Sequence, residues 1–125
     1  MVLANLVSSE GLTLKVDRSD STAVFEQVAG EIRRAILDGE AKPGERLPPA
    51  RDLAAELGVN TNTVLRALRL LRDEGLLEFR RGRGVSVAGT PERAAVLEKA
   101  RELVALSRSH GYRRDELMRI IESLP

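Results

Sequence analysis

Side chains suited to binding a polyanion are concentrated in one part of this chain. Residues 60–84 hold six arginines but only three acidic residues, a local charge of +3 in a chain whose net charge is +1. A guanidinium group donates hydrogen bonds in a planar fork that matches phosphate oxygens and the edge of guanine. The pattern therefore favours a surface that contacts nucleic acid on one face. Mixed charge on solvated helix faces is the plainer interpretation.

The first part of this basic stretch has the period of a helix over about residues 60–74. Its apolar side consists of Val64, Ala67, Leu68 and Leu71. On the opposite side lie Asn62, Arg66 and Arg69. Asn62 and Arg66 are one turn apart, and their side chains suit the edges of adenine and guanine, respectively. The hydroxyls of Thr61 and Thr63 suit phosphate oxygens, and Asn60 is one of several candidate N-caps.

The second part is a cationic loop between two short alternating strands, 77–79 and 85–87. The strand residues predicted to pack on the helices are Leu77, Phe79, Val85 and Val87. The loop residues predicted to contact DNA are Arg80, Arg81, Gly82 and Arg83. A glycine permits close approach of the backbone, and arginines are attracted to the negative potential of a narrow minor groove.

The remaining elements must hold this helix and this loop in place. We expect a strand over 12–16, a helix over about 22–38 capped from Ser19, Asp20 or Ser21, and a short helix over 49–57. A four-residue turn at 58–61 then leads into the basic helix. This order predicts a winged helix-turn-helix over residues 12–88, mainly α with a small β-hairpin. Residues 1–11 are predicted to be a flexible lead-in.

Two further amphipathic helices are predicted after a boundary at Gly89-Thr90-Pro91, over about 92–109 and 113–124. We interpret residues 92–125 as a two-helix dimerisation element; a tail folded back on its own domain is the alternative. Its apolar residues are Val96, Leu97, Ala100, Leu103, Val104, Leu106, Leu117, Ile120 and Ile121. A twofold dimer would place the basic helices of its two copies about 34 Å apart, or at a wider multiple, on a palindromic DNA site.

Several ordered motifs resemble the GntR family of bacterial transcription regulators. They include Arg46-Leu-Pro-Pro-Ala-Arg-Asp-Leu-Ala54, Leu57-Gly-Val-Asn-Thr-Asn-Thr-Val64 and Arg80-Arg-Gly-Arg-Gly84. The short tail is similar to that of the YtrA-like subgroup, whose members are dimeric repressors. The resemblance implies sequence-specific binding to double-stranded DNA.

The resemblance also implies roles for single residues. It assigns a DNA contact to Arg51, the start of the recognition helix to residues 60–63, and minor-groove contacts to Arg81 and Gly82. One position departs from relatives that read a base with arginine, because Leu65 stands there and arginine follows at Arg66. Contact between Leu65 and a thymine methyl group is the alternative at this position.

Composition argues against other classes of function. The chain has no cysteine and one histidine, His110, so thiolate chemistry and a histidine-rich metal site are not expected. We find no glycine-rich phosphate loop or nucleophile–base pair, and predict neither an enzyme nor a cofactor. No apolar run approaches the ~20 residues of a membrane span, and no signal peptide is evident, so we expect a cytoplasmic protein.

Two further hypotheses remain. A winged-helix module that binds another protein and does not read DNA is the alternative function. A small-molecule effector, if there is one, is expected in an apolar pocket between subunits, near Leu97, Leu103 and Leu117.

Overall fold

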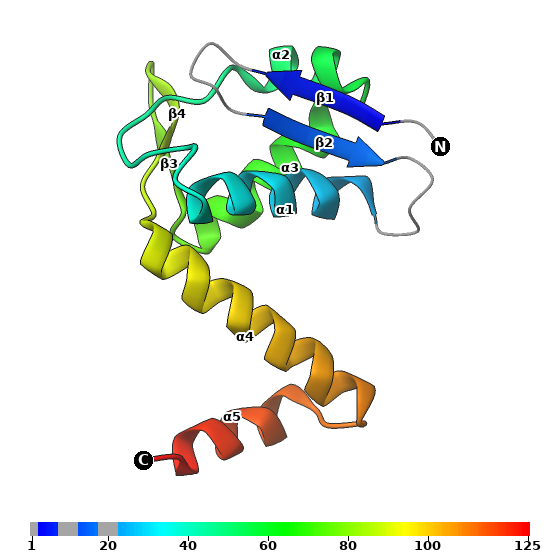
Figure 1. The fold of residues 1–125 in the computed structure, drawn as a ribbon, viewed down its shortest axis with the longest axis vertical. Coiled ribbons are helices and arrows are strands. Elements are labelled where there is room, and N and C mark those ends of the chain that lie inside the picture. The colour runs from blue at the N-terminus through cyan, green and yellow to red at the C-terminus, as the bar shows by residue number, and fades with distance from the viewer. Residues whose placement is uncertain (1–2, 8–12, 18–22) are drawn as a thin grey trace. The chain divides into compact units, whose positions relative to one another are not determined.

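Nine elements make up the described part of the chain in a computed structural model, which describes the backbone of residues 3–7, 13–17 and 23–125. Side chains are described from residue 23 onward. The elements are β1 (Leu3–Val7), β2 (Thr13–Asp17), α1 (Val24–Leu37), α2 (Ala50–Leu57), α3 (Thr61–Asp73), β3 (Leu77–Arg80), β4 (Gly84–Val87), α4 (Pro91–Ser109) and α5 (Arg114–Ser123) (Figure 1). They form two compact units, Met1–Ala94 and Ala95–Pro125, which we describe separately.

The core of the first unit lies among its three helices, with α1 and α2 both packed on α3. The largest fully buried side chains are Val28, Ile32, Ile36, Leu53, Leu57, Val64, Leu68, Leu71 and Leu76. The apolar side predicted for the basic helix is thus confirmed as its core side. Burying each such aliphatic side chain contributes about 1.5–3 kcal/mol, so this stripe fixes which side of α3 faces outward.

Local signals in the sequence set the helix boundaries close to where they were predicted. Gly58 ends α2 in the left-handed conformation, with φ of 68°. The Oδ1 atom of Asn60 accepts a hydrogen bond of 2.8 Å from the backbone N–H of Asn62, which caps the start of α3. The candidate caps Ser19–Ser21 lie outside the described residues, and the residue before α1 is Ala23, without a side-chain cap.

Strands β3 and β4 form the predicted hairpin, with Leu77 opposite Val87 and Phe79 opposite Val85. The inner pair, Leu77 and Val87, is buried. The prediction that Phe79 packs inward is wrong, because its side chain is 36% exposed. Alternation assigned it to the correct strand face, but the outer half of the hairpin extends beyond the helices that would cover it.

The segment before α2 adds a third line of hydrogen bonds to this hairpin. The backbone N–H of Leu47 donates to Val85 O, and that of Val87 donates to Glu45 O, both at 2.8 Å. Arg46 is thereby paired with Ser86 in an isolated antiparallel bridge. The free edge of β4 is covered by a segment far away in sequence, which ties the hairpin to the helices.

The interpretation of residues 1–11 as a flexible lead-in is wrong for residues 3–7, which form β1. This strand pairs antiparallel with β2, with Leu3 opposite Asp17 and Val7 opposite Thr13. Strand β2 was predicted over 12–16 and is found at Thr13–Asp17, in contact with α1, while β1 contacts α2. A hydrogen-bonded partner strand completes the backbone bonding that either strand lacks alone, and this pairing was not considered in the prediction.

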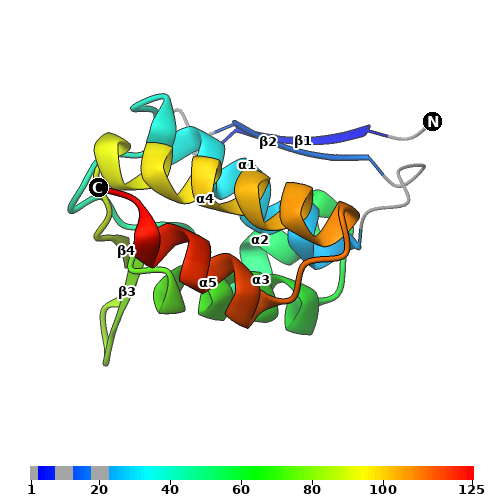
Figure 2. The ribbon, with the colours of Figure 1, turned by 90° about the horizontal axis from the view of Figure 1, so that it is seen from below.

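In the second unit, α5 reverses the direction of α4 after a tight turn, so the two form a helical hairpin (Figure 2). Gly111 takes a φ of 80° in this turn. The backbone N–H of Arg113 donates to Glu116 Oε1 at 2.8 Å, which caps the start of α5. No helix in the described residues combines the length and apolar character that crossing a membrane requires.

Candidate nucleic-acid interface

The outward side of α3 presents the polar residues that its sequence pattern predicted. Thr61, Asn62 and Arg69 are exposed, while Thr63 is half-buried. In Figure 2, α3 runs along the lower side of the first unit and the β3–β4 hairpin extends past it. A helix anchored by one apolar stripe, with its other side free beside a hairpin, has the form of a helix that enters a major groove.

Arg66 is exposed, and its guanidinium group has a neighbour that the sequence pattern did not reveal. Its central carbon lies 3.8 Å from the centre of the Phe25 ring, in the first turn of α1. The contact joins the flank of α3 to α1. Leu65, the neighbouring residue on α3, is half-buried.

Arg51 lies in the first turn of α2 and is exposed. The plainer interpretation was an ion pair with Asp52 or Glu56, but neither pair forms in this structure. Within residues 23–125, no hydrogen bond or ion pair engages Arg51 or Arg69. Both guanidinium groups therefore present charge to solvent at the surface of the helix-turn-helix.

The hairpin arginines differ in how they are engaged. Arg80 pairs with Glu78, with Nε 3.2 Å from Oε1. Arg81 and Arg83 are exposed and have no ion pair among the described side chains. Gly82, between them, takes a φ of 75°, and a Cβ atom built there would meet nothing within 4 Å. The tip is thus cationic, as the sequence predicted, and there is open space around Gly82.

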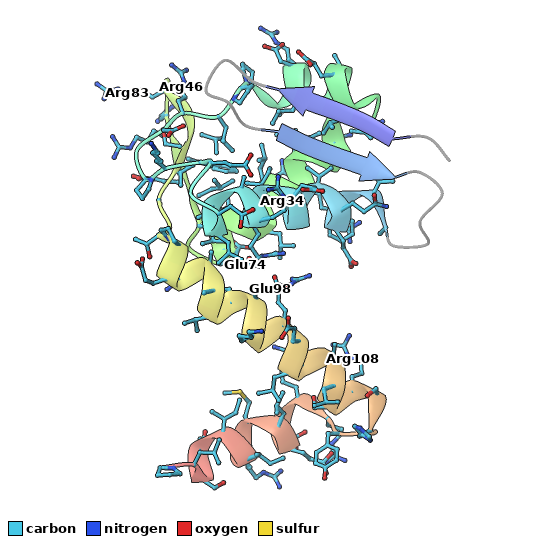
Figure 3. All side chains as sticks on the ribbon, in the orientation of Figure 1. Arg34, Arg46, Glu74, Arg83, Glu98 and Arg108 are labelled. Carbon is cyan, nitrogen blue, oxygen red and sulfur yellow. The ribbon has the colours of Figure 1, made fainter. Side chains whose placement is uncertain are left out.

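Arg46 is a basic residue that the sequence interpretation did not place at this surface. Its Nε atom would lie 3.2 Å from a Cβ atom at Gly84, so its side chain runs along the end of β4 (Figure 3). It is exposed. No periodic pattern includes Arg46, because its position results from the bridge to Ser86, a contact across the fold.

Other arginines of the first unit serve the fold. Arg33 is 3% exposed and pairs with Glu74. Hydrogen bonds to Glu31, Glu40 and Asp38 raise the pKa of Arg34 above its usual range. A basic residue count therefore overstates the charge available to a polyanion. Arg46, Arg51, Arg66, Arg69, Arg81 and Arg83 are the exposed guanidinium groups without an acidic partner among the described side chains of this helix-turn-helix and hairpin.

Comparison with known proteins identifies the fold. The family of bacterial regulatory proteins named gntR matches residues 25–87, which span α1 to β4 and hold all of the candidate contacts above. The chain belongs to the GntR family. It is a member of a family of DNA-binding transcription regulators.

Two GntR-family relatives extend the match beyond this region. The transcriptional regulator Rv1152 of Mycobacterium tuberculosis is 34% identical over 113 residues, which cover 90% of this chain and 93% of that protein. The structure of YtrA from Sulfolobus acidocaldarius, a GntR-family transcription factor, aligns with a TM-score of 0.59 and 32% identity, covering 87% of this chain and 93% of that one. The YtrA-like resemblance is thus confirmed.

A third relative is a DNA-binding domain whose structure includes bound DNA. The DNA-binding domain of AraR, in complex with its operator ORE1, aligns with a TM-score of 0.53 and 29% identity over 58% of this chain and 89% of that domain. In addition, the repressor YtrA of Bacillus subtilis is 37% identical over 75 residues, 60% of this chain and 58% of that protein.

The second unit keeps most of its predicted dimerisation residues accessible. Val96, Ala100, Leu103, Leu106, Ile120 and Ile121 are exposed, Leu97 and Val104 are half-buried, and Leu117 is buried. Leu103, Leu106, Leu117 and Ile120 line an open apolar hollow of about 240 Å³ together with Ser107, His110 and Tyr112. Leu97, which we had placed near such a pocket, is not part of its lining.

Proposed function

We propose that this protein is a transcriptional repressor that binds a palindromic operator as a homodimer. The observation that carries the proposal is the outward side of α3, with Arg69 free of acidic partners in the described chain, beside a hairpin whose tip holds Arg81 and Arg83. Two relatives support it: the YtrA repressor of Bacillus subtilis, and the DNA-binding domain of AraR in complex with an operator.

The assigned contacts follow from the chemistry of each side chain. Asn62, Arg66 and Arg69 would read base edges or phosphates in the major groove, with Asn60, Thr61 and Thr63 on the adjacent phosphates. Arg51 would bind the backbone from the start of α2. Arg80, Arg81 and Arg83 would follow the neighbouring minor groove, which Gly82 allows the chain to approach closely.

The apolar surface of the second unit supports the dimer. Val96 is 69% exposed and Leu106 is 56% exposed, and both lie on α4. Several large exposed aliphatic side chains on one small unit are unfavourable in water unless a partner covers them. A second copy is the partner that also explains a palindromic site, because twofold symmetry in the protein requires twofold symmetry in the DNA.

Selection of bound fragments from random duplex DNA tests the operator. We expect a palindrome with half-sites one helical turn or a multiple apart, and an affinity that falls steeply as salt rises. Failure of the purified protein to bind any duplex at low salt would refute DNA reading. Binding to a protein partner that survives loss of Arg51 and Arg81 would favour the interaction module instead.

Sedimentation tests the dimer separately. Ile121→Asp places a charge on the apolar surface outside the hollow, and we expect it to yield monomers at micromolar concentration. Ala105→Asp adds the same charge to an exposed residue of α4, whereas Ile121 lies on α5, and should leave the dimer intact. Dimers in both variants would place the interface elsewhere.

The apolar hollow of the second unit suits a small apolar effector. Such a molecule would change operator affinity by favouring one dimer arrangement over another. Titration of apolar metabolites against the protein–operator complex tests this role, and unchanged operator affinity throughout would argue against it.

A further inference from the structure

The stacking of Arg66 on Phe25 does more than join α3 to α1, because it limits the conformations of an exposed arginine. The distance of 3.8 Å from the guanidinium carbon to the ring centre is well inside the ~6 Å range of a cation–π contact. Phe25 is half-buried in the first turn of α1, so the ring is held by the domain, while Arg66 on α3 is exposed. A fixed ring therefore holds a side chain that would otherwise sample many rotamers.

This contact orients Arg66 without using its hydrogen-bond donors. The five N–H groups of a guanidinium lie in its plane, whereas the aromatic ring covers one of its faces. A carboxylate partner would occupy those donors and neutralise the charge. Within residues 23–125, no acceptor engages Arg66, so its donor edge stays available to a ligand.

A second arginine on the same helix provides the contrast. Arg72 lies over the Phe79 ring at 4.9 Å, and its Nε also donates to Asp73 Oδ1 at 3.2 Å. Its charge and part of its donor edge are already engaged. Of these two stacked arginines, Arg66 is the one whose donors and charge no described side chain engages.

We infer that Phe25 is a positioning residue that presents Arg66 to a guanine edge in the operator, and so determines the base preference at one position of each half-site. The inference rests on the proposed function. Because the guanidinium group is already oriented in the free protein, less side-chain conformational entropy is lost when DNA binds. A bidentate contact with guanine O6 and N7 requires the fork geometry that the stack leaves open.

The test uses the full-length protein and the operator selected above, with each guanine replaced in turn by 7-deazaguanine, which lacks the N7 acceptor. Wild type should lose affinity at one position per half-site, and Arg66→Ala should be insensitive at that position. Phe25→Leu, which keeps apolar volume but lacks the ring, should bind the operator about two- to fivefold more weakly, as expected for an exposed cation–π contact. It should also respond less to 7-deazaguanine at that position.

Controls separate positioning from folding. Phe25→Tyr retains the ring and should restore both the affinity and the 7-deazaguanine profile. Val24→Ala removes apolar volume from the neighbouring half-buried residue and should leave the profile unchanged. Melting temperatures of all variants report on the fold.

The outcomes distinguish the inference from the proposed function. A wild-type protein without sequence preference refutes the proposed function itself. A selective wild type whose guanine profile is unchanged in Phe25→Leu overturns the positioning role. An equal loss of affinity for operator and random DNA in that variant also overturns it, because loss of base reading affects the operator selectively.

Discussion

Arg33 on α1 and Glu74 at the end of α3 form a two-pronged ion pair in the interior of the first unit. The Nε and Nη2 atoms of Arg33 donate to the two carboxylate oxygens of Glu74, each at 3.0 Å. The exposed fractions of the two side chains are only 3% and 15%. Because Arg93 Nε also donates to the backbone oxygen of Glu74 at 2.9 Å, this residue ties the end of α3 to both α1 and the first turn of α4.

Loss of one partner from this pair should destabilise the domain. Arg33→Met leaves the carboxylate without its principal cation, and we expect the free energy of unfolding to fall by about 3–5 kcal/mol. Urea denaturation followed by circular dichroism measures the change. The double variant Arg33→Met/Glu74→Leu should recover part of the loss, since it removes the unpaired charge as well. Equal stability of the single variant and wild type would show that the pair contributes nothing.

The tip of the hairpin should contribute charge to DNA binding. Arg81→Ala and Arg83→Ala should each weaken operator binding and reduce the slope of log K against log salt by about 1 if the lost contact is with a phosphate. Lys99→Ala removes one positive charge from a lysine paired with Glu102 on α4 and serves as the control. A slope that is the same in all three variants and wild type would argue against a role for the tip.

Leu65 should recognise a thymine methyl group, if it contacts a base. Replacing each thymine of the selected operator by uracil removes one methyl group at a time. We expect about a fourfold loss of wild-type affinity at one position per half-site, the effect of one methyl group removed from an apolar contact. Leu65→Ala should abolish that sensitivity. Uracil tolerated at every position would exclude the contact.

Two glycines of the first unit should respond oppositely to alanine. Gly30 lies within α1 with nothing within 4 Å of a built Cβ atom, so Gly30→Ala should stabilise the domain by about 0.5–1 kcal/mol. At Gly89 a Cβ atom would lie 3.0 Å from the backbone Cα of Leu76, so Gly89→Ala should cost about 1–3 kcal/mol. Thermal unfolding of both variants measures these shifts. A destabilised Gly30→Ala would mean that α1 is constrained there by something other than space.

The helices and their core sides could be predicted from sequence because their determinants are local. Val64, Ala67, Leu68 and Leu71 recur at helical spacing, and all four are fully buried. Asn60 and Gly58 mark the ends of neighbouring helices through bonds to residues nearby in the chain. The outward residues of α3 followed from the same periodicity, because the side opposite a buried stripe faces solvent.

Contacts between elements distant in sequence could not be predicted in this way. Phe79 follows the alternation of its strand, but only the fold shows that the hairpin extends beyond its support. Arg46 reaches the hairpin through a bridge to Ser86, and Arg66 meets a ring on α1. Arg46 and Arg66 are each separated from their partner by tens of residues, and no periodic signal in the chain relates the two.

The amino-acid order alone determined where helices begin and end, which stripe of each is apolar, and where cationic side chains are concentrated, since these depend on spacing along a few turns. Only the folded molecule decided which arginines are available to a ligand. Arg33 and Arg51 have the same side chain, but one is enclosed with Glu74 and the other faces solvent. That difference depends on what other elements bring within hydrogen-bonding distance, and electrostatic pairing acts through space rather than along the chain.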